Sequence, residues 1–327
     1  MTISVVRMEQ DMKGKQRNVV TQTGRTRKWN SLSMLKKNWV CYLFVLPMLL
    51  YVILFSYVPM YGIQLAFKDF KAVDGIWGSS WVGLKHFKTF FESYQFGTLL
   101  WNTLAVSIYS LIAGFPLPIL FALILNYVHN GKFKKFSQMV TYAPHFISMV
   151  VFCGMITIFL ANDGIINHFL MLFGADPVSF MSDPKKWRHI YVWSGVLQNL
   201  GWGSIMYISV LTSVGPELHE AAKVDGANMF QRLCHIDVPA IIPTMVIMLI
   251  MRTGEIMSVG FEKAFLLQNN VNLNYSEIIS TYTYKIGIQG GQFSYSAAIG
   301  LFNNIINLIL LLTVNKIAKK VSDVSLW

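Results

Sequence analysis

Charged residues, cysteines and the motifs of soluble enzymes are scarce in this chain. Only 13% of its 327 residues are Asp, Glu, Lys or Arg, whereas soluble domains carry about a quarter. The three cysteines (Cys41, Cys153 and Cys234) share no short spacing, which gives no support to a disulfide framework or a zinc site. The sequence has no G-x-x-x-x-G-K-[ST] phosphate loop, H-E-x-x-H pair or G-x-S-x-G elbow. We therefore expect a non-catalytic chain that binds no metal or cofactor itself.

Long apolar runs make up much of what is present. Hydrophobic residues form 54% of the chain, and a helix of about 20 residues crosses a hydrocarbon core of about 30 Å. Because apolar sequence begins only near Cys41, we expect no cleavable signal peptide. The pattern predicts an all-α polytopic membrane protein with six transmembrane helices, at 41–66, 99–126, 139–160, 190–213, 241–264 and 294–315.

The net charge of +11 is concentrated at the start of the chain. Residues 1–40 hold nine Lys or Arg against Glu9 and Asp11, and basic segments beside a first span favour the cytoplasmic side. Nucleic-acid binding by this tail is the alternative that we set aside. Without the tail, the segments on the two sides carry eight Lys or Arg each. We expect cytoplasmic termini and the following order: a basic tail at 1–40, a first helix with its external segment at 41–98, a five-helix core at 99–315 and a C-terminal tail at 316–327.

A polar, helix-forming segment at 214–240 interrupts the apolar core and is predicted to face the cytoplasm. Pro216 suits a first helical turn and Glu217 complements the helix dipole. Gly226 can end that helix with a positive φ, and a second short helix at about 228–235 would follow and stop before Pro239. A polar helical loop on a membrane protein is suited to docking a soluble partner. The plain alternative is an amphipathic interfacial helix.

The spacing within this segment is specific. Glu220-Ala221-Ala222, Gly226, Ile236 and Pro239 resemble the EAA loop of bacterial ABC-importer permeases, E-A-A-x3-G-x9-I-x-L-P, with Val238 in place of the usual Leu. The resemblance implies that this loop couples the chain to a separate ATPase, which uses ATP and Mg. The residues assigned to ATPase coupling are Glu220, Ala221, Ala222, Asp225, Gly226, Ile236 and Pro239.

The likeness extends over nearly the whole chain from residue 40. It includes Phe55–Ile63, Trp81–Leu84, Ala143–Ser148, Gly201–Ser204 and Thr281–Gly287. These segments look like the MalF-like, polysaccharide and lipoprotein-type permeases of carbohydrate ABC importers. The resemblance implies a type I importer fold in the bacterial cell membrane, in contact with lipid. It also implies a second permease, two ATPase subunits, an extracellular solute-binding lipoprotein and alternating access.

The solute stays open in part. The resemblance implies an oligosaccharide or polysaccharide fragment, neutral or acidic, while the EAA pattern is shared with importers of other solutes. A secondary transporter would need inverted repeats and several ionisable residues at mid-membrane, and an intramembrane enzyme would need a nucleophile with a base. Uptake driven by an ion gradient without ATPase subunits would favour the former.

Polar and aromatic side chains inside the predicted spans or between them are candidates for the substrate path. Arg252 and Glu255 lie three residues apart, where they can share a helix face and pair; they line the path or fix the helix against a neighbour. Asn199 and Trp202 suit a sugar ring, although a Trp in a span often only packs. His145 is expected to satisfy an internal hydrogen bond. The substrate-path candidates are Asn199, Trp202, Arg252, Glu255, Glu262 and Tyr282.

Overall fold

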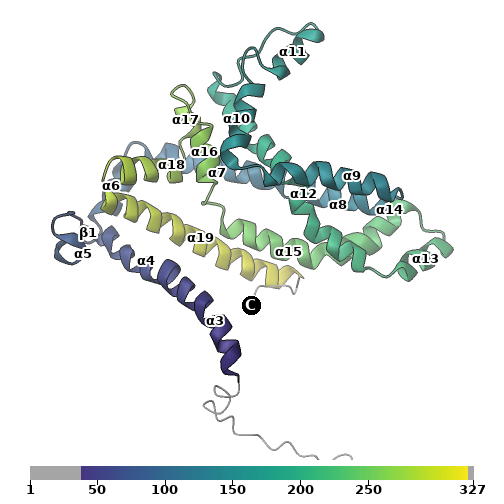
Figure 1. The fold of residues 1–327 in the computed structure, drawn as a ribbon, viewed down its shortest axis with the longest axis horizontal. Coiled ribbons are helices and arrows are strands. Elements are labelled where there is room, and N and C mark those ends of the chain that lie inside the picture. The colour runs from purple at the N-terminus through teal and green to yellow at the C-terminus, as the bar shows by residue number, and fades with distance from the viewer. Residues whose placement is uncertain (1–37, 323–327) are drawn as a thin grey trace, which may run out of the picture. The chain divides into compact units, whose positions relative to one another are not determined.

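The computed structural model describes residues 38–322, which fall into two compact units, up to Tyr61 and from Gly62 onward. Almost all elements are helical (Figure 1). They are α3 (Trp39–Val52), η1 (Ile53–Tyr57), α4 (Val58–Met60), η2 (Tyr61–Phe67), β1 (Lys68–Asp69), α5 (Gly75–Gly78), β2 (Ser80–Trp81), α6 (Lys85–Glu92), α7 (Phe96–Gly114), α8 (Pro116–Tyr127), α9 (Gly131–Tyr142), η3 (Ala143–Phe146), α10 (Met149–Phe159), α11 (Ile165–Leu172), η4 (Pro184–Lys186), α12 (Trp187–Ser213), α13 (Pro216–Val224), α14 (Met229–Arg232), η5 (Leu233–Asp237), α15 (Val238–Gly254), α16 (Phe261–Leu266), α17 (Leu273–Ser276), α18 (Ile279–Tyr284), η6 (Lys285–Gln289) and α19 (Phe293–Ser322).

The first unit is a long apolar helix that is widened before a proline. α3 and α4 are joined by the π-helical segment η1, which ends two residues before Pro59. Proline has no N–H, and its ring collides with the carbonyl four residues earlier. A π turn bonds five residues back instead and relieves this conflict. Pro59 is therefore accommodated by a local widening of an otherwise continuous helix.

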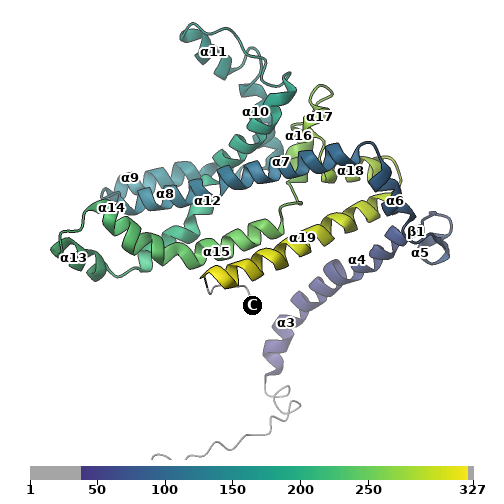
Figure 2. The same cartoon turned by 180° about the vertical axis from the view of Figure 1, so that it is seen from behind.

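In the second unit, the long helices pack in neighbouring pairs. α8 and α9 lie beside α12, and α15 lies beside α19 (Figures 1 and 2). A core cluster containing Ile119, Tyr207 and Ile241 joins α8, α12 and α15. A second cluster, around Phe90 and Ile299, joins α6 to α19. The helices α10 and α11 extend away from these pairs (Figure 2).

Membrane-crossing capacity is clear for most of the predicted spans. Within residues 38–322, four helices are long and apolar enough to cross: Trp39–Phe67, Phe96–Tyr127, Met229–Gly254 and Phe293–Lys320. A pair bent by 104° at a short break, Gly131–Phe146 and Met149–Phe159, makes a fifth if it is one span. The break follows from Pro144 in the η3 turn and from Ser148, whose hydroxyl caps α10. α12 contains the predicted run 190–213 and has 27 residues, but it is not among these apolar spans.

The predicted span 241–264 is wrong at its C-terminal half, because α15 ends at Gly254. Side chains from two other helices bond the backbone that follows: Ser107 donates to the Ile256 carbonyl, and Asn307 accepts from the Met257 N–H at 2.9 Å. These bonds satisfy peptide groups that a helix would have paired internally. The chain then restarts as α16, so residues 255–260 form a break inside the bundle.

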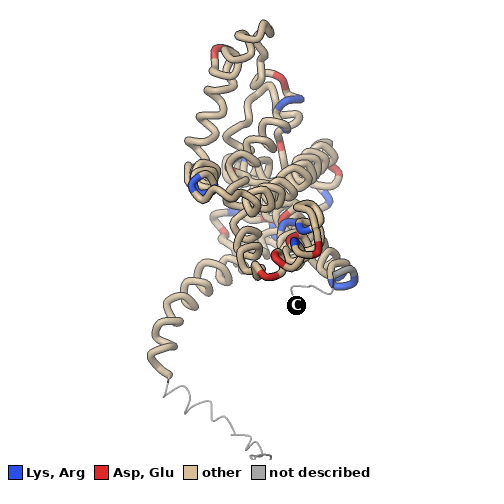
Figure 3. Tube along the Cα trace, turned by 90° about the vertical axis from the view of Figure 1, so that its right-hand side faces the viewer, with Lys and Arg blue, Asp and Glu red and all other residues tan. Residues whose placement is uncertain are grey.

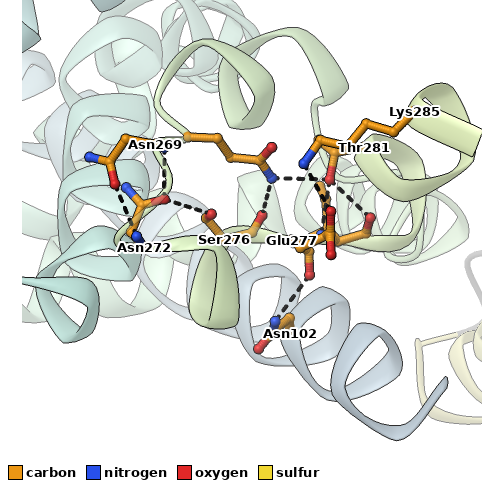
Figure 4. Close-up of polar contacts among 9 residues, drawn as sticks. Asn102, Asn269, Asn272, Ser276, Glu277, Thr281 and Lys285 are labelled. Carbon is orange, nitrogen blue, oxygen red and sulfur yellow. Dashed lines mark hydrogen bonds and ion pairs between the residues drawn. The ribbon is translucent and has the colours of Figure 1, made fainter. Parts of the chain in front are cut away.

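A polar network fixes the segment between α16 and α19 onto α7 (Figure 4). The buried Asn102 amide donates to the carbonyls of Asn274 and Glu277, each at 3.0 Å. The Asn102 oxygen accepts a bond of 2.7 Å from Arg188 of α12. Lys285 pairs with Glu277 at 2.8 Å. Side-chain bonds thus hold the short helices of this stretch against α7 and α12.

One short hairpin departs from the predicted all-α fold. β1 and β2 pair antiparallel, with Lys68 opposite Trp81. The buried Lys68 ammonium donates to the Ile76 carbonyl at 2.7 Å and lies 4.9 Å from the Trp81 ring centre. The hairpin closes the loop that precedes α6.

Candidate functional site

The helix α13 begins and ends as the sequence predicts. Pro216 occupies its first turn and Glu217 supplies the acidic residue there. At the other end Gly226 has φ +81°. Its N–H bonds the Lys223 carbonyl at 3.1 Å, and the Ala227 N–H reaches back to the Ala222 carbonyl at 2.8 Å. These two bonds form a Schellman motif. The four-residue spacing from Ala222 to Gly226 in the sequence therefore corresponds to the turn that ends α13.

The turn after Gly226 leads directly into the next span. Asn228 and Gln231 cap each other's backbone N–H groups at 2.8 Å, which starts α14. The prediction of a separate short helix at 228–235 is wrong, because Met229–Gly254 is continuous. The π segment η5 ends two residues before Pro239 and accommodates it, as η1 does for Pro59. A single tight turn therefore connects α13 to a membrane-crossing helix.

The surface of this loop combines exposed apolar and charged groups. Val224 is 88% exposed and Phe230 is 73% exposed, so two apolar side chains of this loop are accessible to a partner. Lys, Arg, Asp and Glu gather around α13 and α14, whereas the long helices carry few of them (Figure 3). Glu220, Ala221 and Pro239 are exposed. A hollow of about 300 Å³ is lined by Ala222, Asp225, Gly226, Ala227, Gln231, Arg232, His235 and Ile236.

A buried carboxylate, which the sequence analysis missed, ties this loop to α8. Asp237 has no exposed surface. Its oxygens accept from the Tyr127 hydroxyl at 2.5 Å and from the Asn126 amide at 3.3 Å. They also lie 3.4 Å from Nε2 of His219, which belongs to α13. The signal in the sequence was an acid between Ile236 and Pro239, at the start of an apolar run.

The two candidates on α12, Asn199 and Trp202, both contact His145 of η3. The Asn199 oxygen lies 3.0 Å from the His145 Nδ1, and the Asn199 amide donates to the Gly195 carbonyl at 3.0 Å. The His145 ring stacks on Trp202, with centroids 4.4 Å apart and planes 7° apart. The prediction that His145 satisfies an internal hydrogen bond is confirmed. One face of Trp202 is thereby covered, although the residue stays 47% exposed.

Arg252 and Glu255 do not form the pair that the sequence allowed. α15 ends between them, with Glu255 as its C-terminal cap, and within residues 38–322 no ion pair joins them. Both line a cavity of about 250 Å³. Arg252 also lines an adjoining cavity of about 370 Å³ together with Asn199 and Lys263. Lys263, the second cation in the predicted span 241–264 after Arg252, was not among the residues that the sequence singled out.

The remaining candidates, Glu262 and Tyr282, lie apart from these cavities. Glu262 is exposed in the first turn of α16. Tyr282 is buried against Phe90, Met257 and Ile299. Burial, followed by interaction with Tyr295, raises the pKa of the Tyr282 phenol, so it stays neutral. The structure therefore places Asn199, Arg252 and Glu255 on two adjoining cavities, with Trp202 beside Asn199 at His145. Glu262 and Tyr282 line neither cavity.

Known proteins resemble this chain over most of its length. The family model described as "Binding-protein-dependent transport system inner membrane component" matches residues 114–323. The polygalacturonan/rhamnogalacturonan transport system permease protein YteP of Bacillus subtilis is 42% identical over 88% of this chain and 89% of its own length. Protein LplB of Bacillus subtilis is 38% identical over 94% of this chain and 96% of its own length.

The fold has a solved counterpart. A chain in the crystal structure of a bacterial ABC transporter involved in the import of the acidic polysaccharide alginate superposes with a TM-score of 0.83 and 37% identity. That match covers 89% of this chain and 99% of the other. The helices described above therefore have the arrangement of a type I ABC importer permease. This protein belongs to the family of inner membrane components of binding-protein-dependent transport systems.

Proposed function

We propose that this chain is one permease subunit of an ATP-driven ABC importer for an oligosaccharide or polysaccharide fragment. A second, non-identical permease would complete the membrane domain. Two ATPase subunits would supply ATP hydrolysis with Mg, and an extracellular solute-binding lipoprotein would deliver the solute. The observation that carries the proposal is the loop 214–240, in which a short exposed helix is joined by one capped turn to a membrane-crossing helix.

The loop is suited to receive force from an ATPase. Glu220 and Ala221 are exposed on α13, where a small side chain permits close approach of a groove and a carboxylate can meet its rim. Asp225, Gly226 and Ile236 border the hollow beside them. Pro239 lies at the start of α15, within the span that would move. Because Asp237 contacts both α13 and α8, a displacement of α13 would also reach α8.

The topology that fits this role has six membrane crossings and both termini in the cytoplasm. Four apolar helices and the bent pair account for five crossings, and α12, with its 27 residues, is long enough for the sixth. This order places 214–240 on the cytoplasmic side with the ATPase. Accessibility of single cysteines at Val224 and Val73 to an impermeant thiol reagent tests it, in a background with the native cysteines removed. Val73 should react in intact cells and Val224 only after the membrane is opened.

The carbohydrate solute is supported by the relatives. YteP and the arabinooligosaccharides transport system permease protein AraP, which is 30% identical over 90% of this chain, carry saccharides in their names. A related structure holds an alginate pentasaccharide-bound periplasmic protein. For this chain, the residues proposed to line the substrate path are Asn199, Trp202, Arg252 and Glu255. The proposal that Glu262 and Tyr282 also line it is supported only by their residue types.

Uptake by the assembled importer in proteoliposomes tests the proposal. A labelled oligosaccharide should enter only with ATP on the ATPase side and with the binding protein present. Unlabelled saccharides should compete, while amino acids, polyamines and inorganic anions should not. Competition by one of these other solutes would move the chain to a non-sugar importer. Uptake driven by an ion gradient without ATPase subunits would establish a secondary transporter and refute the proposal.

A further inference from the structure

The cavity of about 370 Å³ between α7, α8, α12, α15 and α16 carries two cations and no carboxylate among its lining residues. Small-molecule sites occupy about 300–1,000 Å³. Lys263 reaches it from α16 and Arg252 from the last turn of α15. Charges inside a membrane protein are costly and mark sites where an ion or solute compensates them. The side chains that line the cavity therefore favour a negatively charged ligand.

The Lys263 side chain is held in place without an acidic partner among the described residues. The residue is 5% exposed, and its Nζ donates to the Tyr191 carbonyl at 2.6 Å and lies 4.7 Å from the Tyr191 ring centre. A Cβ on Gly195 would lie 2.9 Å from this Nζ, so the glycine leaves room for the ammonium. Across residues 38–322, Lys263 makes no ion pair. A buried charge held only by a neutral carbonyl and a ring retains capacity for an anion.

The Arg252 guanidinium likewise has no charged partner in the described chain. It lies against Gly114 and Gly203, whose added Cβ atoms would be 3.8 Å and 3.9 Å from it. Gly195 and Gly203 are eight residues apart on α12, which corresponds to about 12 Å along the helix. The two cationic groups therefore sit at separate ends of the cavity. One small anion cannot bridge this separation, whereas a chain of sugar rings with successive carboxylates can.

Unpartnered polar atoms complete the lining. The Gln198 side-chain oxygen and the Ser110 hydroxyl are buried without a hydrogen-bond partner, and both residues line the cavity. Gln198 is 4% exposed. Buried polar atoms of this kind are nearly always satisfied in proteins. A carbohydrate hydroxyl can donate to both, so the cavity matches a polyhydroxylated ligand as well as a negative one.

We propose that this cavity binds a uronate-containing oligosaccharide, with Lys263 and Arg252 each pairing with the carboxylate of a different sugar ring. Gln198 and Ser110 accept bonds from ring hydroxyls between them. The inference rests on the proposed function and narrows its solute to an acidic saccharide. Glu255, on the adjoining cavity that shares Arg252, adds a negative charge near one end and opposes binding there.

The test compares a galacturonate trisaccharide with its carboxyl-reduced, neutral counterpart of equal length, in proteoliposomes of the assembled importer. Wild type should prefer the acidic saccharide. Lys263→Met and Arg252→Gln should each lower the acidic-to-neutral uptake ratio about tenfold or more, since each variant loses one charge-assisted hydrogen bond to the acidic saccharide. Gly195→Ala keeps the charge but crowds the Lys263 ammonium and should lower the ratio in the same direction. Lys88→Met, on the exposed α6 surface, is the matched control and should leave the ratio unchanged.

Three results would overturn the inference. They are a wild type that prefers the neutral saccharide, variants that leave the ratio unchanged, and variants that lower uptake of both saccharides equally while the assembly elutes intact. Glu255→Gln sharpens the test, because it should raise the ratio; a fall would show that Glu255 and Arg252 act as a structural pair. If wild type takes up neither saccharide but transports another solute, the proposed function itself fails.

Discussion

The loop 214–240 and the cation-lined cavity are built by opposite means. In the loop, each decisive contact joins residues within about one helical turn, as in the Ala227–Ala222 bond and the Asn228–Gln231 cap. In the cavity, Ser110 of α7 and Gln198 of α12 lie far in sequence from each other and from Arg252 and Lys263 of α15 and α16. A motif of local contacts can be recognised from its spacing, whereas a cavity assembled by packing cannot. Asp237 is the exception within the loop, because its partners Asn126 and Tyr127 are distant.

The largest effect is expected where the loop depends on a distant contact. Asp237→Ala leaves Tyr127, Asn126 and His219 without their shared acceptor in a buried position. The substitution should lower the free energy of unfolding by about 2–4 kcal/mol, because removing a buried, hydrogen-bonded carboxylate leaves its partners without a hydrogen-bond acceptor. Thermal unfolding in detergent measures it. Asp225→Ala, on the exposed turn, is the matched control; equal stability of both variants would show that Asp237 does not anchor the loop.

A smaller effect is expected from the local part of the loop. Gly226→Ala keeps open space around the new methyl group but forces a φ of +81° on a residue with a Cβ. This should cost about 1 kcal/mol and lower the ATPase activity coupled to transport. Gly131→Ala provides the comparison, because it is equally open and has no positive φ. If Gly226→Ala behaves like Gly131→Ala, the Schellman turn does not control the loop.

The smallest effect is expected in the polar network that fixes the segment between α16 and α19. Lys285→Met removes the partner of Glu277, and both side chains are partly exposed. Such pairs contribute about 1 kcal/mol or less, so the unfolding temperature should fall only slightly. Glu92→Gln, which removes the exposed pair with Lys88, should change nothing measurable. A large loss for Lys285→Met would mean that the 266–285 segment is held by charge rather than by the Asn102 amide.

The sequence predicted the structural features that depend on contacts between residues close together in the chain. The N-terminal proline, the closing glycine and the helix between them were all readable in 216–226, and five of six apolar runs correspond to apolar helices or to the bent pair. It did not predict the end of α15, because that break is stabilised by Ser107 and Asn307 from other helices. The sequence did not identify Lys263 and Gln198 for the same reason, because their position on the cavity depends on which helices surround them.

The same dependence on packing decides which of the candidate residues for the substrate path meet in the structure. Arg252 and Glu255 were expected to pair from an i, i+3 spacing that holds only within a continuous helix. The helix stops before Glu255, so the two side chains border a shared cavity without bonding. Tyr282 was chosen by residue type, but packing buries it against Phe90 and Ile299. Residue type and spacing therefore identify candidates, and the packing decides which of them meet.

The most direct test of the account is co-purification from gently solubilised membranes, comparing wild type with Glu220→Lys/Gly226→Trp. Gly131→Trp/Lys135→Glu, between the predicted spans 99–126 and 139–160 and on the same side of the membrane in the proposed topology, is the matched control. Wild type and control should bring down a second permease and an ATPase with measurable activity, whereas the loop variant should keep the permease and lose the ATPase. If wild type purifies alone and without ATPase activity, or if the loop variant retains the ATPase, the loop 214–240 is not the coupling element.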